Sequence, residues 1–162
     1  MRVHMGANYQ GYELGRALEE WLAAEGHEVI WHGADFLDQD DDYPLFCLRV
    51  GQAVIADEDA GADTRGVVVG GMGTGEVIAA NKVNGARAVA AFDVAYVESA
   101  RRHANANILV VPAERVDLAT AKNLIAALLN GKFGYSLDDA RRLVNTNEYE
   151  NSKTIEGWQI EG

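Results

Sequence analysis

The segment from residue 66 to residue 75 constrains the fold of this chain most. Residues 66–69 read Gly-Val-Val-Val, without the polar alternation of a strand that has one face in solvent. Such a strand belongs inside a sheet that is covered on both faces. The next six residues, Gly70–Gly75, include four glycines, so the backbone can turn sharply there and adopt conformations closed to other residues. The segment therefore predicts a central strand followed by a tight loop.

Similar strands alternate with helical patterns along the rest of the chain. Further strands are expected at Val3–Met5, Glu28–Trp31, Ala86–Phe92 and Ile108–Val111. Helices are expected over 14–22, from Tyr43-Pro44 onward, and over 76–83, 94–104, 118–129 and 137–149. This alternation is typical of a parallel sheet with right-handed crossovers. We expect a single α/β domain, a Rossmann-like doubly wound parallel sheet of about five strands flanked by helices.

Charge and composition exclude several kinds of partner. The 162 residues suit one domain, and 14 Lys plus Arg against 25 Asp plus Glu give a formal net charge of -11. Such a surface repels nucleic-acid phosphates and anionic lipids. The single cysteine, Cys47, lies in an apolar run, and no stretch resembles a signal peptide or a membrane span. We expect a cytoplasmic protein that binds neither nucleic acid nor membranes.

The glycine-rich loop is the first candidate binding site. Ligands of parallel α/β sheets bind beyond the carboxyl ends of the strands, where backbone amides are free to hold an anion or a developing oxyanion. Both nucleotide signatures fail here, because Glu76 stands where a dinucleotide fingerprint needs its third glycine and no Gly-Lys-Ser/Thr follows. A nucleotide-binding regulator would rest on fold analogy alone. A tight turn that only lets a helix pack is the structural alternative.

Glu76 follows this loop directly, at the start of the expected helix. A carboxylate beside a ring of amides suits carbon-acid chemistry, in which a base removes a proton next to a carbonyl and the amides hold the enediolate. A carboxylate at a helix N-terminus also interacts favourably with the helix dipole. The residues alone leave both roles open.

Several stretches resemble one known family. The string from Gly73 to Ala88, GTGEVIAANKVNGARA, is similar to the ribose-5-phosphate isomerase B and galactose-6-phosphate isomerase family. The start Gly6–Leu14, the triplet Asp42-Tyr43-Pro44 and the segment Ala100–Asn107 are similar to it as well. The resemblance extends over residues 1–150 and leaves a polar tail, residues 151–162, outside it.

The resemblance implies an enzyme that interconverts aldose and ketose sugar phosphates through a cis-enediolate, with no metal or other cofactor. Ribose 5-phosphate and ribulose 5-phosphate are the default substrates of the family. It also implies a homodimer, or a tetramer, whose sites are completed across the subunit interface. Phe133, Tyr135 and the last helix are candidate interface elements, and Ile155, Trp158 and Ile160 of the tail are apolar enough to dock on a neighbour.

Site residues are carried over position by position. Many family members use a cysteine base at the position of Gly70, whereas a second branch uses a glutamate where Glu76 stands, which favours Glu76 as the base. His103 matches the histidine that assists opening of the furanose ring. The alternative is a histidine at a helix end with no catalytic role. The expected catalytic residues are Glu76, His103 and Asn8. The expected substrate-binding residues are Tyr9, Tyr43, Gly71, Met72, Gly73, Thr74, Gly75, Asn105, Arg115, Arg141 and Arg142.

The polar residues of the site depart from the family at several positions. Asn8 replaces an aspartate, Tyr9 a histidine, Met72 a serine or threonine, and Ala104 an asparagine. An asparagine keeps hydrogen bonding but cannot accept a proton as a base. Asn8 is therefore expected to orient a hydroxyl.

The phosphate pocket departs further. The family arginine after the strand near Val111 aligns with Glu114, although Arg115 is adjacent, and only Arg141 and Arg142 remain of a C-terminal basic cluster. A carboxylate repels a phosphate. The alternatives are therefore an isomerase of a non-phosphorylated or differently substituted sugar, and a non-catalytic sugar-binding or partner subunit.

Overall fold

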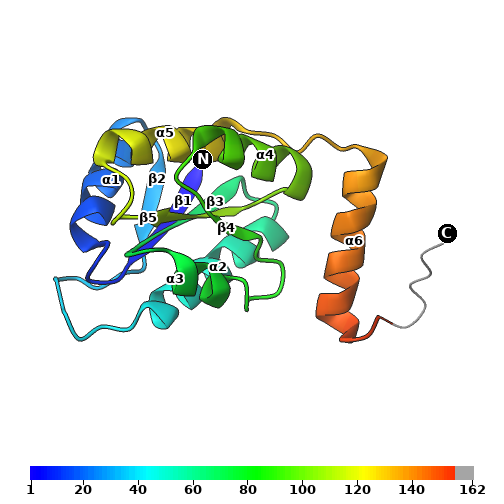
Figure 1. Ribbon diagram of the computed structural model, residues 1–162, viewed down its shortest axis with the longest axis horizontal. Helices are drawn as coiled ribbons and strands as arrows, with labels where there is room; N and C mark the ends of the chain where they lie inside the picture. The colour runs from blue at the N-terminus through cyan, green and yellow to red at the C-terminus, as the bar shows by residue number, and fades with distance from the viewer. Residues whose placement is uncertain (156–162) are drawn as a thin grey trace.

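The structure, a computed structural model that describes residues 1–155, is a parallel five-stranded sheet between layers of helices (Figure 1). The strands are β1 (Arg2–Ala7), β2 (Glu28–Trp31), β3 (Thr64–Gly70), β4 (Ala88–Ala90) and β5 (Ile108–Pro112), in the order β2-β1-β3-β5-β4. The helices are α1 (Tyr12–Ala24), α2 (Tyr43–Asp59), α3 (Thr74–Ala80), α4 (Val94–Ala104), α5 (Leu118–Asn130) and α6 (Leu137–Ser152). The expected doubly wound α/β domain is confirmed.

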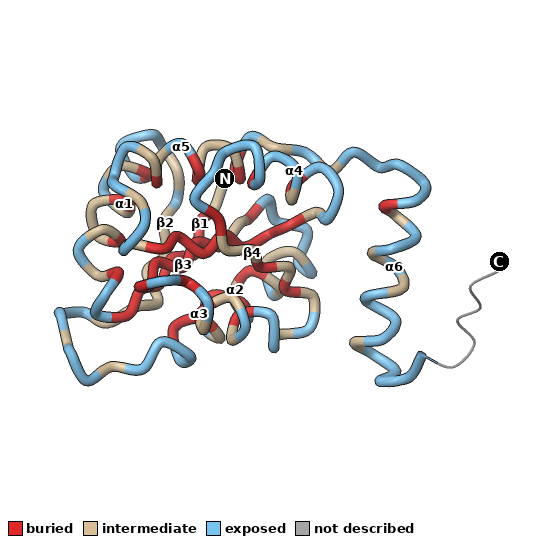
Figure 2. Tube along the Cα trace, in the orientation of Figure 1, coloured by how far each residue is buried: buried red, intermediate tan, exposed pale blue. Residues whose placement is uncertain are grey.

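The two faces of β3 explain its unbroken apolar sequence. Val67 and Val69 belong to the core cluster on the side of α1, α4 and α5, while Val68 belongs to the cluster on the side of α2 and α3. Neighbouring side chains of a strand point to opposite faces, so a central strand with helices on both sides can bury apolar side chains on both of its faces. Figure 2 shows this buried layer running through the sheet, with the exposed surface on the helices and loops.

Two elements around the glycine loop differ from their expected bounds. Helix α3 begins at Thr74 and ends at Ala80, rather than spanning 76–83, because Gly73 adopts a left-handed conformation (φ 84°) at the N-cap. Thr74 and Gly75 are therefore part of its first turn. Strand β4 covers three residues instead of 86–92, and the Asn81 side chain bonds both the amide (2.8 Å) and the carbonyl (2.9 Å) of Ala88.

Helix α6 stands apart from the body of the domain (Figures 1 and 2). It is fastened near its start by Asp139 to His103 (2.9 Å) and near its end by Glu150, which accepts the Gly85 amide at 2.9 Å. Apolar side chains along it are exposed, with Leu137 at 89% and Val144 at 62%. The helix passes the expected start of the tail by two residues and ends at Ser152.

Little of the expected tail belongs to the described residues. Ile155 is exposed, whereas Trp158 and Ile160 lie outside the part of the chain that the structure describes. Within residues 1–155, no helix has the length and apolar character needed to cross a membrane.

Candidate active site

The loops after β1, β3 and β5 meet at one edge of the sheet, namely the side formed by the carboxyl ends of the parallel strands. Strand β3 lies between β1 and β5, so the segments that follow these three parallel strands are neighbours. Backbone hydrogen bonds join two of them: Ala113 donates to the Gly70 carbonyl (2.8 Å) and Glu114 donates to the Gly71 carbonyl (3.1 Å). The glycine loop is thus held in place by the loop after β5.

The Glu76 carboxylate occupies the space of the missing side chain of Gly70. A Cβ built on Gly70 would lie 2.0 Å from Oε1 of Glu76 and 2.4 Å from its Cδ. Glu76 is only 5% exposed and folds back from the first turn of α3 over the end of β3. A side chain at position 70 and a carboxylate at position 76 cannot share this volume. Glycine at 70 is therefore a steric requirement for the observed position of Glu76.

The one cysteine does not supply an alternative base. Cys47 lies on α2 and is fully buried, and burial, with the nearby charge of Glu76, raises the pKa of its thiol to about 12. The thiolate is the nucleophilic and basic form of cysteine. At neutral pH Cys47 remains a neutral thiol packed near Glu76.

Backbone amides and a phenol surround this carboxylate. No acceptor among residues 1–155 takes a hydrogen bond from the amides of Gly71, Met72 or Gly73, so these donors are free to bind a ligand. Tyr43 approaches from the first turn of α2, and a Cβ on Gly75 would lie 2.4 Å from its hydroxyl oxygen. The arrangement brings free donors, a hydroxyl and a carboxylate to one place.

The loop after β1 contributes Asn8 and Tyr9. Asn8 is 5% exposed and its Oδ1 accepts a hydrogen bond from the Gly11 amide at 3.2 Å. The Tyr9 amide donates to Oδ1 of Asp41 at 3.0 Å. Both predicted residues therefore lie beside the glycine loop, since β1 pairs with β3 up to Ala7 and Val69.

Asp41 lies beside the predicted site residue Tyr9, and the sequence interpretation missed it. It belongs to the acidic segment before α2, which charge alone predicts to be a solvated loop, yet its Oδ2 is buried and has no hydrogen-bond partner within residues 1–155. Burial raises the pKa of this carboxyl, and the neighbouring charges of Asp38 and Asp42 act in the same direction. Its position directly before Asp42-Tyr43-Pro44 was the available signal.

A second acidic side chain covers the other side of the loop. Nε2 of Gln10 donates to Oε1 of Glu114 at 3.2 Å, and a Cβ on Gly71 would lie 2.5 Å from the Gln10 Oε1 and 2.9 Å from the Glu114 Oε1. The guanidinium of Arg115 instead lies 5.9 Å from the ring centroid of Phe92. Glu114, rather than Arg115, contacts the glycine loop.

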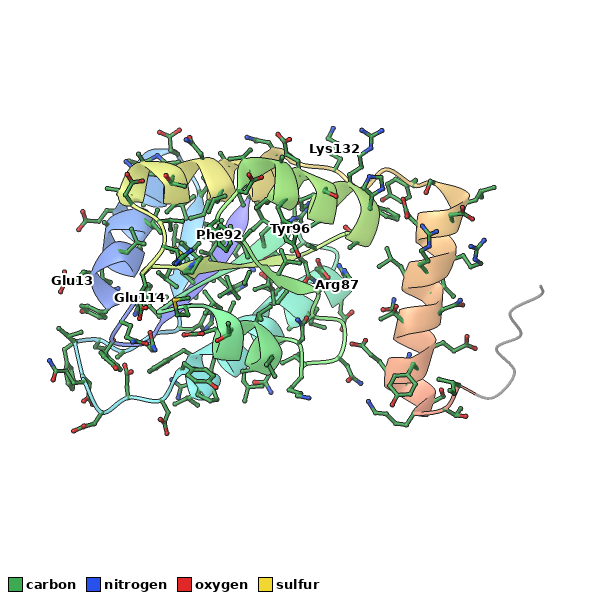
Figure 3. The ribbon with its side chains drawn as sticks, in the orientation of Figure 1. Glu13, Arg87, Phe92, Tyr96, Glu114 and Lys132 are labelled. Atoms are coloured by element: carbon green, nitrogen blue, oxygen red, sulfur yellow. The ribbon has the colours of Figure 1, made fainter. Side chains whose placement is uncertain are left out.

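The remaining predicted residues lie at the opposite edge of the sheet. Helix α4 runs back from the end of β4 to the start of β5, so His103 and Asn105 at its end are far from the loops that follow the strands. The separation of the two edges can be followed in Figure 3, where Glu114 follows β5 and Arg87 precedes β4. Nδ1 of His103 lies 2.9 Å from Oδ2 of Asp139, which belongs to α6.

The two arginines of α6 are engaged with carboxylates of the same helix. Arg141 donates to Asp138 (2.8 Å) and Arg142 donates to Asp139 (2.9 Å). One chain thus divides the predicted site into two groups, one around the glycine loop and one around the end of α4. The first group contains Asn8, Tyr9, Tyr43, Gly71, Met72, Gly73, Thr74, Gly75 and Glu76. The second contains His103, Asn105, Arg141 and Arg142.

A metal centre is not formed by the described part of the chain. No group of three or more His, Cys, Asp or Glu side chains within residues 1–155 is arranged to hold a metal ion.

The fold is a parallel α/β sheet whose glycine loop brings a buried carboxylate and free backbone amides together. Residues 3–145 match the Ribose/Galactose Isomerase family, and the chain belongs to it. Ribose-5-phosphate isomerase B of Mycobacterium tuberculosis is 39% identical over 150 residues, which cover 93% of this chain and 90% of that protein.

Two further relatives show the range of the similarity. The galactose-6-phosphate isomerase subunit LacA of Lactococcus lactis is 32% identical over 136 residues, which cover 82% of this chain and 89% of that protein. The crystal structure of ribose-5-phosphate isomerase B from Mycoplasma genitalium with bound ribulose-5-phosphate superposes with a TM-score of 0.86 at 26% identity. That match covers 93% of this chain and 97% of that one.

Proposed function

We propose that this protein is an aldose–ketose isomerase that interconverts ribose 5-phosphate and ribulose 5-phosphate through a cis-enediolate. The observation that carries the proposal is the Glu76 carboxylate, buried against Gly70 beside three free amides. The high coverage of ribose-5-phosphate isomerase B relatives supports the same activity.

The proposed reaction moves one proton between two carbons. Glu76 removes the proton from C2 of the open-chain aldose, and the electron pair of that bond forms the C1–C2 double bond while the carbonyl oxygen becomes the enediolate oxyanion. The amides of Gly71, Met72 and Gly73 stabilise this charge. Protonated Glu76 then returns the proton to C1, and transfer of the C2 hydroxyl proton to the oxyanion on C1 leaves a C2 carbonyl and a C1 hydroxyl, which is the ketose. General-base catalysis of this kind contributes about 10²–10⁴-fold to the rate.

Asn8 and Tyr43 have supporting roles in the proposal. The Asn8 side chain is held by a hydrogen bond from the backbone amide of Gly11 and can orient a sugar hydroxyl. The Tyr43 hydroxyl lies against the helical turn that carries Glu76. Tyr9 and Thr74 line the same loop edge.

A homodimer is proposed because one chain separates the site into two halves. His103, which would assist opening of the sugar ring, and Asn105 stand at the edge opposite Glu76. A second copy that places its α4 end against the glycine loop of the first brings the halves together. The exposed apolar side chains of α6 offer surface for this contact.

Because sugar phosphates are retained inside cells by their charge, we place the protein in the cytoplasm.

Glu114 supports a second candidate, an isomerase of non-phosphorylated sugars. Its carboxylate lies next to Gly71 and accepts a hydrogen bond from the Gln10 side chain. The guanidinium of Arg115 packs on the ring of Phe92. A phosphate placed near Glu114 would be repelled, at about 2 kcal/mol for two unit charges 8 Å apart at an effective dielectric near 20. The Gln10–Glu114 pair could instead bind hydroxyls of a neutral sugar.

The test is hydrogen exchange in D2O, followed by NMR at C1 and C2 of ribose 5-phosphate, ribulose 5-phosphate and the free pentoses. The Glu76→Gln variant removes the base with almost no change in shape, and Glu13→Gln makes the same chemical change on the exposed face of α1. Exchange that is lost in Glu76→Gln and kept in Glu13→Gln supports the isomerase.

The pattern of substrates decides between the two candidates. Exchange with the pentose phosphates supports the first proposal, and exchange with free pentoses alone supports the second. Saturable sugar binding without exchange in the wild-type protein would contradict both and identify a non-catalytic sugar-binding subunit.

A further inference from the structure

A pocket near the amino ends of the strands, on the side of the sheet opposite the glycine loop, carries an excess of positive charge in an otherwise acidic protein. It has a volume of about 420 Å³ and lies between the start of β3, the end of α4 and the segment that joins α5 to α6. Its charged lining residues are Arg65, Arg101, Lys132 and Glu58. We propose that this pocket binds a phosphate group of a small molecule at a place separate from the glycine loop, with Asn105 as the one lining residue it shares with the predicted isomerase site.

Arg101 forms the floor of this pocket and lacks a carboxylate partner. It is only 3% exposed, and its guanidinium donates to three neutral oxygens, those of the Gly131 carbonyl, the Ala106 carbonyl and the Asn105 side chain. Within residues 1–155, no carboxylate lies within 4 Å of it. Removing a charge from water without pairing it is costly. A bound anion would supply the missing partner.

The pKa of Arg101 reflects this lack of compensation. Burial lowers the pKa of the guanidinium to about 10, and the positive charges of Arg65 and Arg87 lower it further, against the opposing effect of Glu58 and Asp63. The carboxylates nearby therefore do not balance the cations. An anion in the pocket would favour the charged form of Arg101.

Arg65 adds a second incompletely bonded guanidinium. Its side chain is 15% exposed, and its Nε is buried without a hydrogen-bond partner within residues 1–155. Its Nη1 donates to the Thr64 carbonyl, and the nearest carboxylate, Asp63 at 3.8 Å, is 69% exposed and so largely screened. Buried polar nitrogens in proteins are nearly always hydrogen-bonded, so the unpaired Nε leaves the charge of Arg65 incompletely compensated.

The charge and shape of the lining indicate the class of ligand. Three cationic side chains face one carboxylate, and Glu58 is itself engaged by Arg87 (3.5 Å) and by the Asn107 amide (3.1 Å). The excess of two positive charges matches a phosphate dianion, which arginine binds through parallel hydrogen bonds. Phe133 and Tyr135, whose rings pack edge to face at 4.7 Å, provide an apolar wall for the rest of the molecule.

The test follows the arginine Nε–Hε signals by ¹H–¹⁵N NMR while inorganic phosphate is added at constant ionic strength. We expect saturable shifts of the Arg65 and Arg101 signals. Arg65→Gln and Lys132→Gln each should weaken the apparent affinity at least about tenfold, as expected for the loss of one charge-assisted hydrogen bond. Lys82→Gln, which removes the same charge from an exposed position after α3, is the matched control.

The outcomes separate this site from the isomerase site. Shifts that saturate in the Arg141→Gln variant, which removes a predicted substrate-binding arginine, as they do in the wild-type protein support a separate phosphate site, whatever becomes of the proposed isomerase activity. Shifts that rise linearly without saturation, or that are weakened equally by Lys82→Gln, would show a general ionic effect and overturn the proposal. The absence of any shift at Arg65 and Arg101 would overturn it as well.

Discussion

Replacing Gly70 by alanine tests the position of the proposed base without changing the base itself. The added Cβ would lie 2.0 Å from Oε1 of Glu76, whereas non-bonded atoms approach to about 3.5 Å. The carboxylate must therefore move by more than about 1 Å. Gly70 is not among the residues with positive φ, so alanine is compatible with its backbone conformation.

The expected effects on activity and on stability differ widely. A displacement of about 1 Å in a catalytic group costs about 100-fold in rate, equivalent to about 2.7 kcal/mol of transition-state stabilisation. The free energy of unfolding should change by less than about 1 kcal/mol, because the displaced atoms are the end of a flexible side chain and alanine restricts the unfolded chain. The variant should thus be folded and nearly inactive.

The assay compares kcat and KM for the preferred sugar in Gly70→Ala, Glu76→Gln and the double variant, with urea unfolding of each. If Gly70 acts only through Glu76, adding Gly70→Ala to Glu76→Gln lowers kcat by no more than about threefold. A Gly70→Ala enzyme with kcat within about threefold of wild type would refute the steric argument. Full multiplication of the two losses would refute the coupling.

Three further predictions concern substrate choice and pH. Glu114→Gln should lower KM for ribose 5-phosphate relative to free ribose by about 30-fold, because it removes about 2 kcal/mol of like-charge repulsion. An unchanged ratio, as expected for the control Glu13→Gln, would contradict the role of Glu114. Hydrogen bonds from His103 and Ser136 lower the pKa of Asp139 to about 2 from 3.8, so its contribution to stability is present above pH 3.8 and is lost as the pH falls toward 2. Asp139→Asn should therefore flatten the fall of the unfolding free energy over that interval, and an unaltered profile would argue against the His103–Asp139 contact. Burial, followed by the charges of His4 and Arg49, lowers the pKa of His32 below 6.5, so protonation opposes folding and stability declines as the pH falls below 6.5. Chemical denaturation of His32→Gln at pH 7 and pH 5 should show a smaller decline than wild type, and an equal decline would locate the titrating group elsewhere.

Local sequence patterns determined the elements of this protein. The apolar run at 66–69 defined a strand covered on both faces, and the alternation of strands and helices defined a parallel sheet, because periodicity and burial are properties of neighbouring residues. The motif around Glu76 also indicated a site and a family, both of which depend on short contiguous stretches.

Tertiary structure alone decided how separate segments meet. Sequence spacing does not show that the Glu76 carboxylate fills the space of a side chain at position 70, or that Asp41 turns inward from an acidic loop toward Tyr9. It also does not separate His103 from Glu76, which stand at opposite edges of the sheet because α4 runs against the strands. These relations depend on contacts between residues distant in the chain, and such contacts are set by the packing of whole elements rather than by any local pattern.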